Sequence, residues 1–152
     1  MNNNHITMHI TQITAATPET LAAINALLPH LSERAKPITI DRLEQIVRSN
    51  STYLFLATDD RNTAGMFTLN LTQLPTGPRL WLDDLVLSPD LRGKGLGRQL
   101  TEAAIAEARR ISPTATLMLT SKPARIAANS IYVTLFQHKN TNVYQLPLFI
   151  YT

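Results

Sequence analysis

The chain has 152 residues, of which 44% are hydrophobic and 16% are charged, and it contains no cysteine. This composition is typical of a globular protein, and the length fits one domain over residues 1–152. The lack of cysteine excludes disulfides, thiolate nucleophiles and zinc–thiolate sites. The formal charge of +3 is too small to require nucleic acid as a partner, because a small polyanionic ligand accounts for it equally well.

Hydropathy along the chain predicts no membrane partner. No hydrophobic run approaches the roughly 20 residues that span a bilayer, and the first residues lack the pattern of a signal peptide. Together with the missing cysteines, this predicts a cytoplasmic protein. The four histidines are too dispersed for a recognisable metal motif, so we expect no metal.

The periodicity of the hydrophobic residues predicts an alternation of strands and helices. In chain order, we expect a strand over 6–11, a helix from Thr17-Pro18 to about Leu31, a helix from Ile40 to about Asn50, strands over 52–57, 67–71 and 80–87, a helix over 96–111, a strand over 114–119, a helix from Pro123 to about Phe136, and one or two short strands over 143–151. This order predicts a mixed α/β sheet with helices on both faces.

The stretch "LRGKGLGRQL", Leu91 to Leu100, contains three of the five glycines of the chain. It joins a predicted strand to a helix N-terminus, where free N–H groups and the helix dipole favour anions. Glycine lets the backbone approach a ligand closely and adopt positive φ. The stretch is therefore a candidate phosphate-binding loop. The alternative is an ordinary glycine-rich start of a helix with solvated charges.

The segment "LVLSPDLRGKGLGRQLTEAAIAEAR" resembles the acetyl-CoA signature of the GNAT superfamily of N-acetyltransferases. That signature is Gln/Arg-x-x-Gly-x-Gly/Ala, and Arg92-Gly93-Lys94-Gly95-Leu96-Gly97 fits it. "LTSKPARIAANSIYVTLF" is similar to the later strand and the tyrosine-bearing helix of the superfamily. The resemblance implies a GNAT fold with a mostly antiparallel mixed sheet and a splayed cofactor slot. The chain departs from the superfamily after Tyr132, because no glycine precedes Phe136. The end of this helix must therefore differ by one residue or be capped in another way.

The resemblance also implies a binding mode for acetyl-CoA. Its pantetheine arm would lie against the backbone of Leu85, Val86 and Leu87, and the N–H of Leu85 is a candidate oxyanion donor. Its pyrophosphate would bind the N–H groups from Arg92 to Arg98. Asn129 would support either the arm or the start of its own helix.

Direct transfer of an acetyl group to an amine needs a base and an acid. By resemblance Tyr132 is the acid, and helical spacing places it on one stripe with Arg125 and Asn129. The alternative is a tyrosine at the edge of the core. Asp83 and Asp84 are the candidate bases, and strand alternation predicts that only one of them reaches the slot. Similar "IED" strands favour Asp83 slightly. The alternative is that these carboxylates form caps or salt bridges and that water acts as the base.

The predicted activity is acetyl-CoA-dependent N-acetylation of a primary amine, such as an amino acid, a peptide or a small amine, by direct attack in a ternary complex. Mixed charge in the loop at Glu33, Arg34 and Lys36 weakly favours an acceptor with a carboxylate. The alternative function is a non-catalytic CoA-binding or sensor domain. We expect a monomer or a homodimer, and no nucleic-acid partner.

Overall fold

The computed structural model describes residues 6–60 and 62–148. Contacts divide the chain into two compact units, residues 1–120 and 121–152. The first unit contains a five-stranded sheet in the order β1-β2-β3-β4-β5. Its elements are β1 (His9–Gln12), α1 (Pro18–Leu31), α2 (Ile40–Arg48), β2 (Thr52–Thr58), β3 (Thr63–Leu74), β4 (Gly77–Leu87), the 3₁₀ turn η1 (Pro89–Leu91), α3 (Leu96–Ile111) and β5 (Thr116–Met118).

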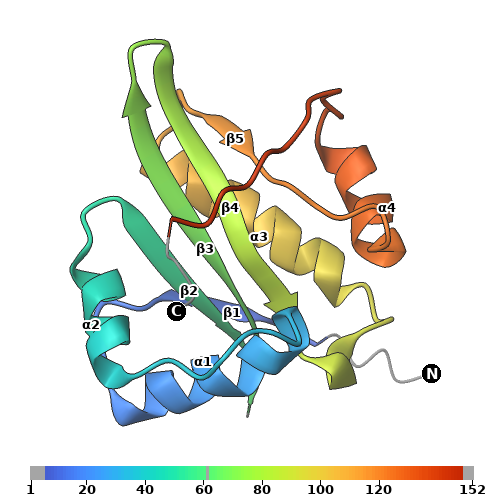
Figure 1. Cartoon of the computed structure of the whole chain (residues 1–152). Helices are drawn as coiled ribbons and strands as arrows, with labels where there is room; N and C mark the ends of the chain where they lie inside the picture. Colours follow the sequence, from blue (N-terminus) through green and yellow to red (C-terminus); the bar gives the residue numbers. More distant parts are fainter. Residues whose placement is uncertain (1–5, 61, 149–152) are drawn as a thin grey trace. The chain divides into compact units, whose positions relative to one another are not determined.

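The sheet is antiparallel from β1 to β4, and β5 joins β4 in parallel. α1 and α2 cover one face and α3 covers the other (Figure 1). This confirms the predicted GNAT-like sheet with helices on both faces. β1 begins three residues later than the predicted strand over 6–11, because its pairing with β2 starts at His9.

Alternate side chains of the central strands fill two hydrophobic cores. On the α3 face, Phe55 stacks on Phe67 with ring centroids 4.8 Å apart. On the α1–α2 face, Leu54 and Met66 pack with Leu43, which is fully buried. Because β2 is covered on both sides, its sequence is continuously hydrophobic rather than alternating.

α1 and α2 begin where the sequence supplies capping residues. The Thr17 hydroxyl accepts a hydrogen bond from the N–H of Thr20, and the Thr20 hydroxyl accepts one from the N–H of Thr17. The Thr39 hydroxyl accepts a hydrogen bond from the N–H of Arg42 at the start of α2. These caps satisfy amides that have no acceptor inside the helix, which fixes where each helix starts.

The second unit contains α4 (Ile126–Leu135) and the C-terminal segment. The predicted strands over 143–151 are wrong over residues 143–148, which form no strand, and residues 149–151 lie outside the described residues. Pro147 interrupts the hydrophobic alternation there and has no N–H to donate to a neighbouring strand.

Candidate active site

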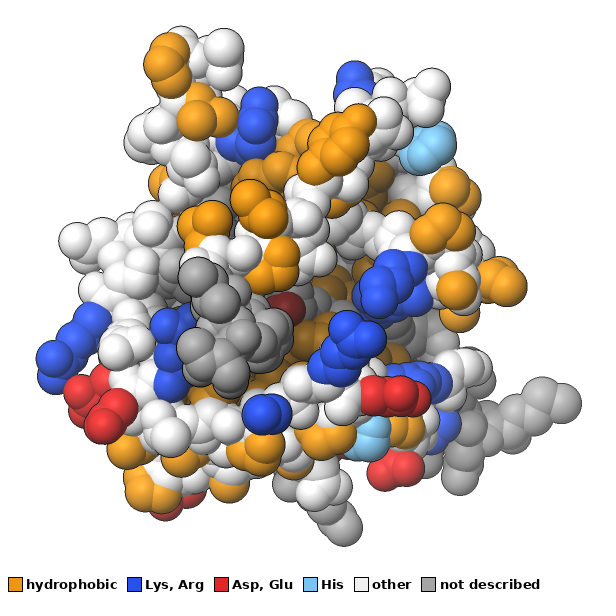
Figure 2. Space-filling view, in the orientation of Figure 1, with side chains coloured by type: hydrophobic (Ala, Val, Ile, Leu, Met, Phe, Trp, Pro, Cys, Tyr) orange, Lys and Arg blue, Asp and Glu red, His pale blue; other side chains and the backbone are white. Residues whose placement is uncertain are grey.

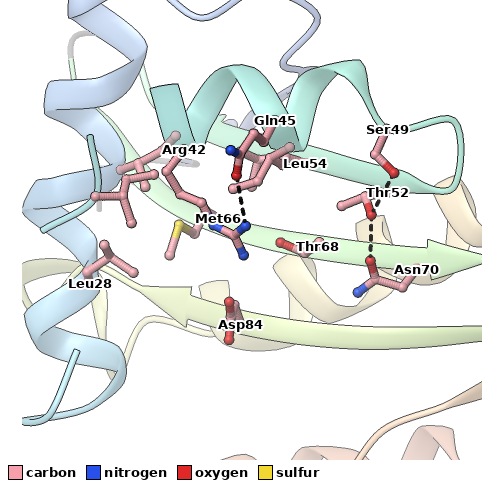
Figure 3. Close-up of a pocket in the computed structure, with 13 residues that line it drawn as sticks. Leu28, Arg42, Gln45, Ser49, Thr52, Leu54, Met66, Thr68, Asn70 and Asp84 are labelled. Carbon is pink, nitrogen blue, oxygen red and sulfur yellow. Dashed lines mark hydrogen bonds between the residues drawn. The ribbon is translucent and has the colours of Figure 1, made fainter. Parts of the chain in front are cut away.

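A pocket of about 480 Å³ lies between the sheet and the two helices α1 and α2 (Figure 3). The sheet provides its floor, with side chains from β2, β3 and β4, and the helices provide its walls. The residues that line it are Ile24, Leu28, Ile38, Arg42, Gln45, Ile46, Ser49, Thr52, Leu54, Met66, Thr68, Asn70 and Asp84. One side of the pocket is therefore hydrophobic, and the other carries hydroxyls, amides and one pair of opposite charges.

Asp84 reaches the pocket because β4 contains a bulge. Met66 pairs with Val86 and Thr68 pairs with Asp83, so Phe67 alone faces both Asp84 and Leu85. Asp84 has φ of +50°, and within the described residues no other residue except glycine has positive φ. Such a conformation costs on the order of 1–2 kcal/mol for a residue with a Cβ. The strain lies at the one carboxylate that lines the pocket.

The two aspartates share a face of β4, but Asp84 is the one that lines the pocket, whereas the sequence slightly favoured Asp83 as the base. Asp83 shares a face with its partner Thr68, which lines the pocket. Asp84 is the extra residue of the bulge and lines the same pocket, whereas Leu85 packs against the core on the α3 face. Regular alternation fails here because the bulge inserts one residue into the pleat.

Asp83 is held by a chain of hydrogen bonds that crosses three strands. Ser49 donates to Thr52 (3.2 Å), Thr52 donates to Asn70 (3.0 Å), and the amide of Asn70 donates to Oδ2 of Asp83 (2.8 Å). The carboxylate of Asp84 accepts no hydrogen bond from the described residues. The two neighbours therefore differ: one carboxylate is occupied, and the other is available.

The environment of Asp84 raises the pKa of its carboxyl group above the ordinary value. The main cause is partial burial, since the pocket walls remove water although the side chain remains accessible from the opening. The negative charge of Asp83 raises the pKa further. Asp84 is thus a stronger proton acceptor than an ordinary aspartate.

The glycine stretch forms a loop whose backbone is open to solvent. Gly93 and Gly95 have φ of +76° and +75°, and a Cβ built on either would meet nothing within 4 Å. The first backbone hydrogen bond of α3 runs from Gln99 to Gly95, so the amides of Leu96 and Gly97 precede it. Lys and Arg side chains are exposed on the face drawn in Figure 2, and Arg92 and Lys94 of this loop are exposed. The loop has the open backbone and positive charge that an anion requires.

Arg98, the third basic residue of the loop, forms an ion pair with Glu102 at 3.0 Å. The pair follows the i, i+4 spacing of the helix surface and is half exposed, so its contribution to stability is small.

The C-terminal part of β4, which precedes the loop, has a free edge on the side of β5. Its pairing with β5 ends at Trp81–Met118, while β4 continues to Leu87. Over the described residues, the segment Leu85–Leu87 thus has no strand on its β5 side. This confirms the predicted splay of the two strands, since a parallel pair that ends early leaves unpaired backbone groups.

In the second unit, Tyr132 is the buried residue of α4. Its ring packs edge to face on Phe136, with centroids 6.2 Å apart. Burial raises the pKa of the Tyr132 hydroxyl, and the positive charge of Arg125 partly opposes this increase. The Asn129 side chain donates to the carbonyl of Lys122 (2.9 Å), which ties it to the turn before its helix.

α4 ends without the glycine that the superfamily pattern places there. The N–H of Phe136 donates to the carbonyl of Tyr132 (2.8 Å), and Phe136 has extended dihedral angles (φ −123°, ψ 157°). An extended residue turns the chain out of the helix without positive φ, so no glycine is needed. Of the two alternatives, a different helix exit or another type of cap, the structure shows the second.

The sequence patterns missed two residues that shape the pocket. Asn25 of α1 holds the backbone of Ile38 from both sides, donating to its carbonyl (3.0 Å) and accepting from its N–H (2.8 Å). Arg42 extends from α2 into the pocket (Figure 3), where its guanidinium donates to Gln45 at 3.2 Å. Neither residue belongs to a motif, and an arginine on an amphipathic helix usually indicates a solvated surface. For Arg42, the only signal in the sequence was its position three residues after Thr39, which caps α2.

The described residues offer neither a membrane-spanning helix nor a metal-binding cluster. None of their helices combines the length and the hydrophobicity needed to cross a membrane. They also contain no group of three or more His, Asp or Glu side chains arranged to hold a metal ion.

Among known proteins, the chain is similar in fold to several acetyltransferases. The aminoglycoside N-acetyltransferase AAC(6')-Iy in complex with CoA superposes with a TM-score of 0.76 at 15% identity, covering 97% of this chain and 99% of that one. An aminoglycoside acetyltransferase from an uncultured soil metagenomic sample, in complex with sisomicin, superposes with a TM-score of 0.71 at 17% identity and covers 95% of both chains. A transcriptional regulator from Bacillus halodurans C-125 superposes with a TM-score of 0.76 at 20% identity, covering 92% of this chain and 100% of that one.

At these identities the superpositions show the fold alone. No curated protein sequence matches the chain significantly. The sequence model of the acetyltransferase (GNAT) family matches residues 20–135, which is most of the chain. The protein therefore belongs to the GNAT family of acetyltransferases.

Proposed function

We propose that the protein transfers the acetyl group of acetyl-CoA to a primary amine bound in the α1–α2 pocket. One observation carries the proposal. A single strand, β4, places the available carboxylate of Asp84 in the pocket and leads through η1 into the glycine loop. One short segment therefore connects the carboxylate that can accept a proton from an amine to the loop that can bind a phosphate.

The glycine loop and the free edge of β4 fit CoA. The amides at the start of α3 and the side chains of Arg92 and Lys94 would bind the pyrophosphate, because both offer positive charge, and Gly93 and Gly95 leave the backbone open to the ligand. The unpaired backbone over Leu85–Leu87 would bind the pantetheine arm as an added strand. Acetyl-CoA supplies the acetyl group as a thioester, and no metal is required for the transfer. The CoA complex of AAC(6')-Iy supports this assignment by analogy.

In the pocket, Asp84 acts as the base. The acceptor arrives as an ammonium group and gives one proton to Asp84, directly or through water, which frees the nitrogen lone pair. The nitrogen then attacks the thioester carbonyl carbon, with the developing oxyanion at the N–H of Leu85. The C–N bond forms, the C–S bond breaks, and the nitrogen releases its second proton. Asp83 accepts a hydrogen bond from Asn70, and its charge beside Asp84 raises the pKa of the Asp84 carboxyl group.

By resemblance to the GNAT superfamily, Tyr132 is the proposed acid, which would give its hydroxyl proton to the departing CoA thiolate. A raised pKa suits this role, because the hydroxyl stays protonated at neutral pH. The proton that the nitrogen releases restores Tyr132 through solvent. The products are the N-acetylated acceptor, free CoA thiol and one proton from the original ammonium group.

The first test compares Asp84→Asn with Asp83→Asn in a thiol-release assay. The assay has no background from the protein, because the chain contains no cysteine. With a panel of primary amines as acceptors, Asp84→Asn should lower turnover by about 10²–10⁴-fold, as loss of a general base does. Asp83→Asn should lower it much less. The rate of the wild type should rise with pH through a pKa above the usual aspartate range, and this limb should be missing in Asp84→Asn.

Binding of acetyl-CoA, followed by calorimetry, is the control for folding. Both variants should bind acetyl-CoA as the wild type does. Unchanged turnover in Asp84→Asn would show that the carboxylate only lines the pocket and does not act as the base. If the wild type binds CoA but acetylates no amine, the protein is a CoA sensor and the proposed transfer is wrong.

A further inference from the structure

From the charges that line the α1–α2 pocket, we infer that the acceptor is a zwitterionic amino-carboxylate with a hydrophobic side chain. Its amine is placed by Asp84, and its carboxylate is bound by Arg42. This inference rests on the proposed function and narrows its substrate class.

The first step is the charge balance of the pocket. Of the 13 residues that line it, Arg42 and Asp84 are the two that carry formal charges. A polyamine or an aminoglycoside carries several positive charges, and it would find one carboxylate and one opposing guanidinium. A ligand with one positive and one negative group matches both charges at once. Charge complementarity of this kind selects partners through the repulsion of mismatched ones.

The second step is the state of Arg42. Its guanidinium donates to the neutral amide of Gln45, and it forms no ion pair with any carboxylate of the described residues. By contrast Arg48, on the same helix, is paired with Glu44 at 3.0 Å. Gln45 fixes one side of the guanidinium and leaves the remaining donors for a ligand (Figure 3). A planar guanidinium matches a carboxylate with two parallel hydrogen bonds.

The third step is the rigidity of the wall that carries Arg42. The two hydrogen bonds between Asn25 and Ile38 fasten the connection between α1 and α2. Thr39 then caps α2 through the N–H of Arg42 itself. The backbone of Arg42 is therefore positioned by two independent contacts, as a binding residue requires.

The fourth step is the hydrophobic part of the pocket. Ile24, Leu28, Ile38, Ile46, Leu54 and Met66 form one side of it. These side chains offer no hydrogen bonds to sugar hydroxyls, but they suit an aliphatic or aromatic side chain. The volume of about 480 Å³ leaves room for an amino acid or a dipeptide.

The experiment compares acceptors that differ only in the carboxylate. Leucine, methionine and phenylalanine are each assayed beside their amides, with Leu-Gly, spermidine and sisomicin as further arms. The wild type should have at least about tenfold higher kcat/KM for an amino acid or for Leu-Gly than for the matching amide, since a charged hydrogen-bonded pair is lost. A higher rate with Leu-Gly than with leucine would identify peptides, rather than free amino acids, as the source.

Variants of Arg42 test the same contact from the side of the protein. Arg42→Gln should raise KM for leucine by about tenfold or more and leave leucinamide unchanged, and Arg42→Lys should restore part of the preference. Arg42→Glu should reverse the preference toward leucinamide. Arg48→Gln is the matched control on the same helix, and it should change neither acceptor.

The outcomes separate the two proposals. If amines are acetylated but leucine and leucinamide react equally, or if Arg42→Gln slows both equally, the inference is wrong and the proposed function stands. Preference for spermidine or sisomicin would also overturn the inference. If the wild type acetylates no member of the panel, the proposed function fails and this inference fails with it.

Discussion

At the scale of single residues, Asp84 combines an unfavourable backbone conformation with an unfavourable environment for its charge. It adopts a backbone conformation that favours glycine or asparagine, and it carries a carboxyl group whose raised pKa records an unfavourable environment for charge. Both features reduce the stability of the folded chain. Such costs persist at sites where the strained residue has a function.

This combination predicts that Asp84→Asn stabilises the protein near neutral pH. The folded state binds a proton at Asp84 more tightly than the unfolded chain does, so the presence of Asp84 lowers stability as pH rises from the ordinary aspartate pKa through the raised one. Asparagine has no charge and tolerates positive φ. We expect a melting temperature higher by a few degrees at pH 7.5, since about 1 kcal/mol corresponds to roughly 2–4 °C at this size. The gain should shrink toward pH 4.

Thermal melts across this pH range provide the measurement. Asp90→Asn, which changes an exposed acid outside the pocket, is the control and should show no comparable gain. A variant Asp84→Asn that melts at or below the wild-type temperature at pH 7.5 would show that the carboxylate is stabilised in the fold by contacts other than those described.

Tyr132 gives a second prediction at this scale. Tyr132→Phe removes one oxygen and keeps the edge-to-face contact with Phe136, so the fold and the affinity for CoA should change little. Turnover should fall by about 10²–10⁴-fold if the hydroxyl protonates the thiolate. The alkaline limb of the wild-type rate should lie above the usual tyrosine range, because the pKa of the hydroxyl is raised. Equal turnover in both proteins would leave Tyr132 as a packing residue.

At the scale of elements, the glycine loop is set by its backbone conformation. Gly95 precedes the first residue of α3 with φ of +75°, and nothing surrounds the place of its missing Cβ. The space is therefore available to a ligand, and a side chain there would obstruct the ligand rather than the fold. Gly77, the first residue of β4 after the turn from β3, has φ of +111° and is equally open, but it lies at the other end of β4 from the loop.

These two glycines form a matched pair for the third prediction. Gly95→Val and Gly77→Val both place a β-branched residue at positive φ, so both should lower the melting temperature. Millimolar acetyl-CoA should raise the melting temperature of the wild type and of Gly77→Val, because it binds the native state. It should fail to do so for Gly95→Val. An equal ligand-induced shift in both variants would remove the loop from the binding site.

At the scale of the whole molecule, the first unit is built as two hydrophobic cores that share one sheet. The pocket opens on the α1–α2 side, while α3 packs closely on the other, where a Cβ at Gly65 would lie 2.5 Å from the carbonyl oxygen of Val86 and 3.0 Å from Leu100. β4 lies between the two cores and ends at the glycine loop. The prediction of one domain over 1–152 stays a prediction beside the two compact units.

The order of the elements up to α4, the sheet with helices on both faces and the glycine loop could be predicted from the sequence alone. These follow from local periodicity, caps and glycine positions, which act over a few residues. The sequence could not determine that Asp83 and Asp84 share a face, because the bulge arises from pairing with β3. It also could not place Arg42 in the pocket with Asp84, since the two are distant in the chain and meet through packing of α2 on the sheet. The predicted strands are wrong over residues 143–148 for the same reason, because a strand forms only where a neighbouring strand accepts its hydrogen bonds.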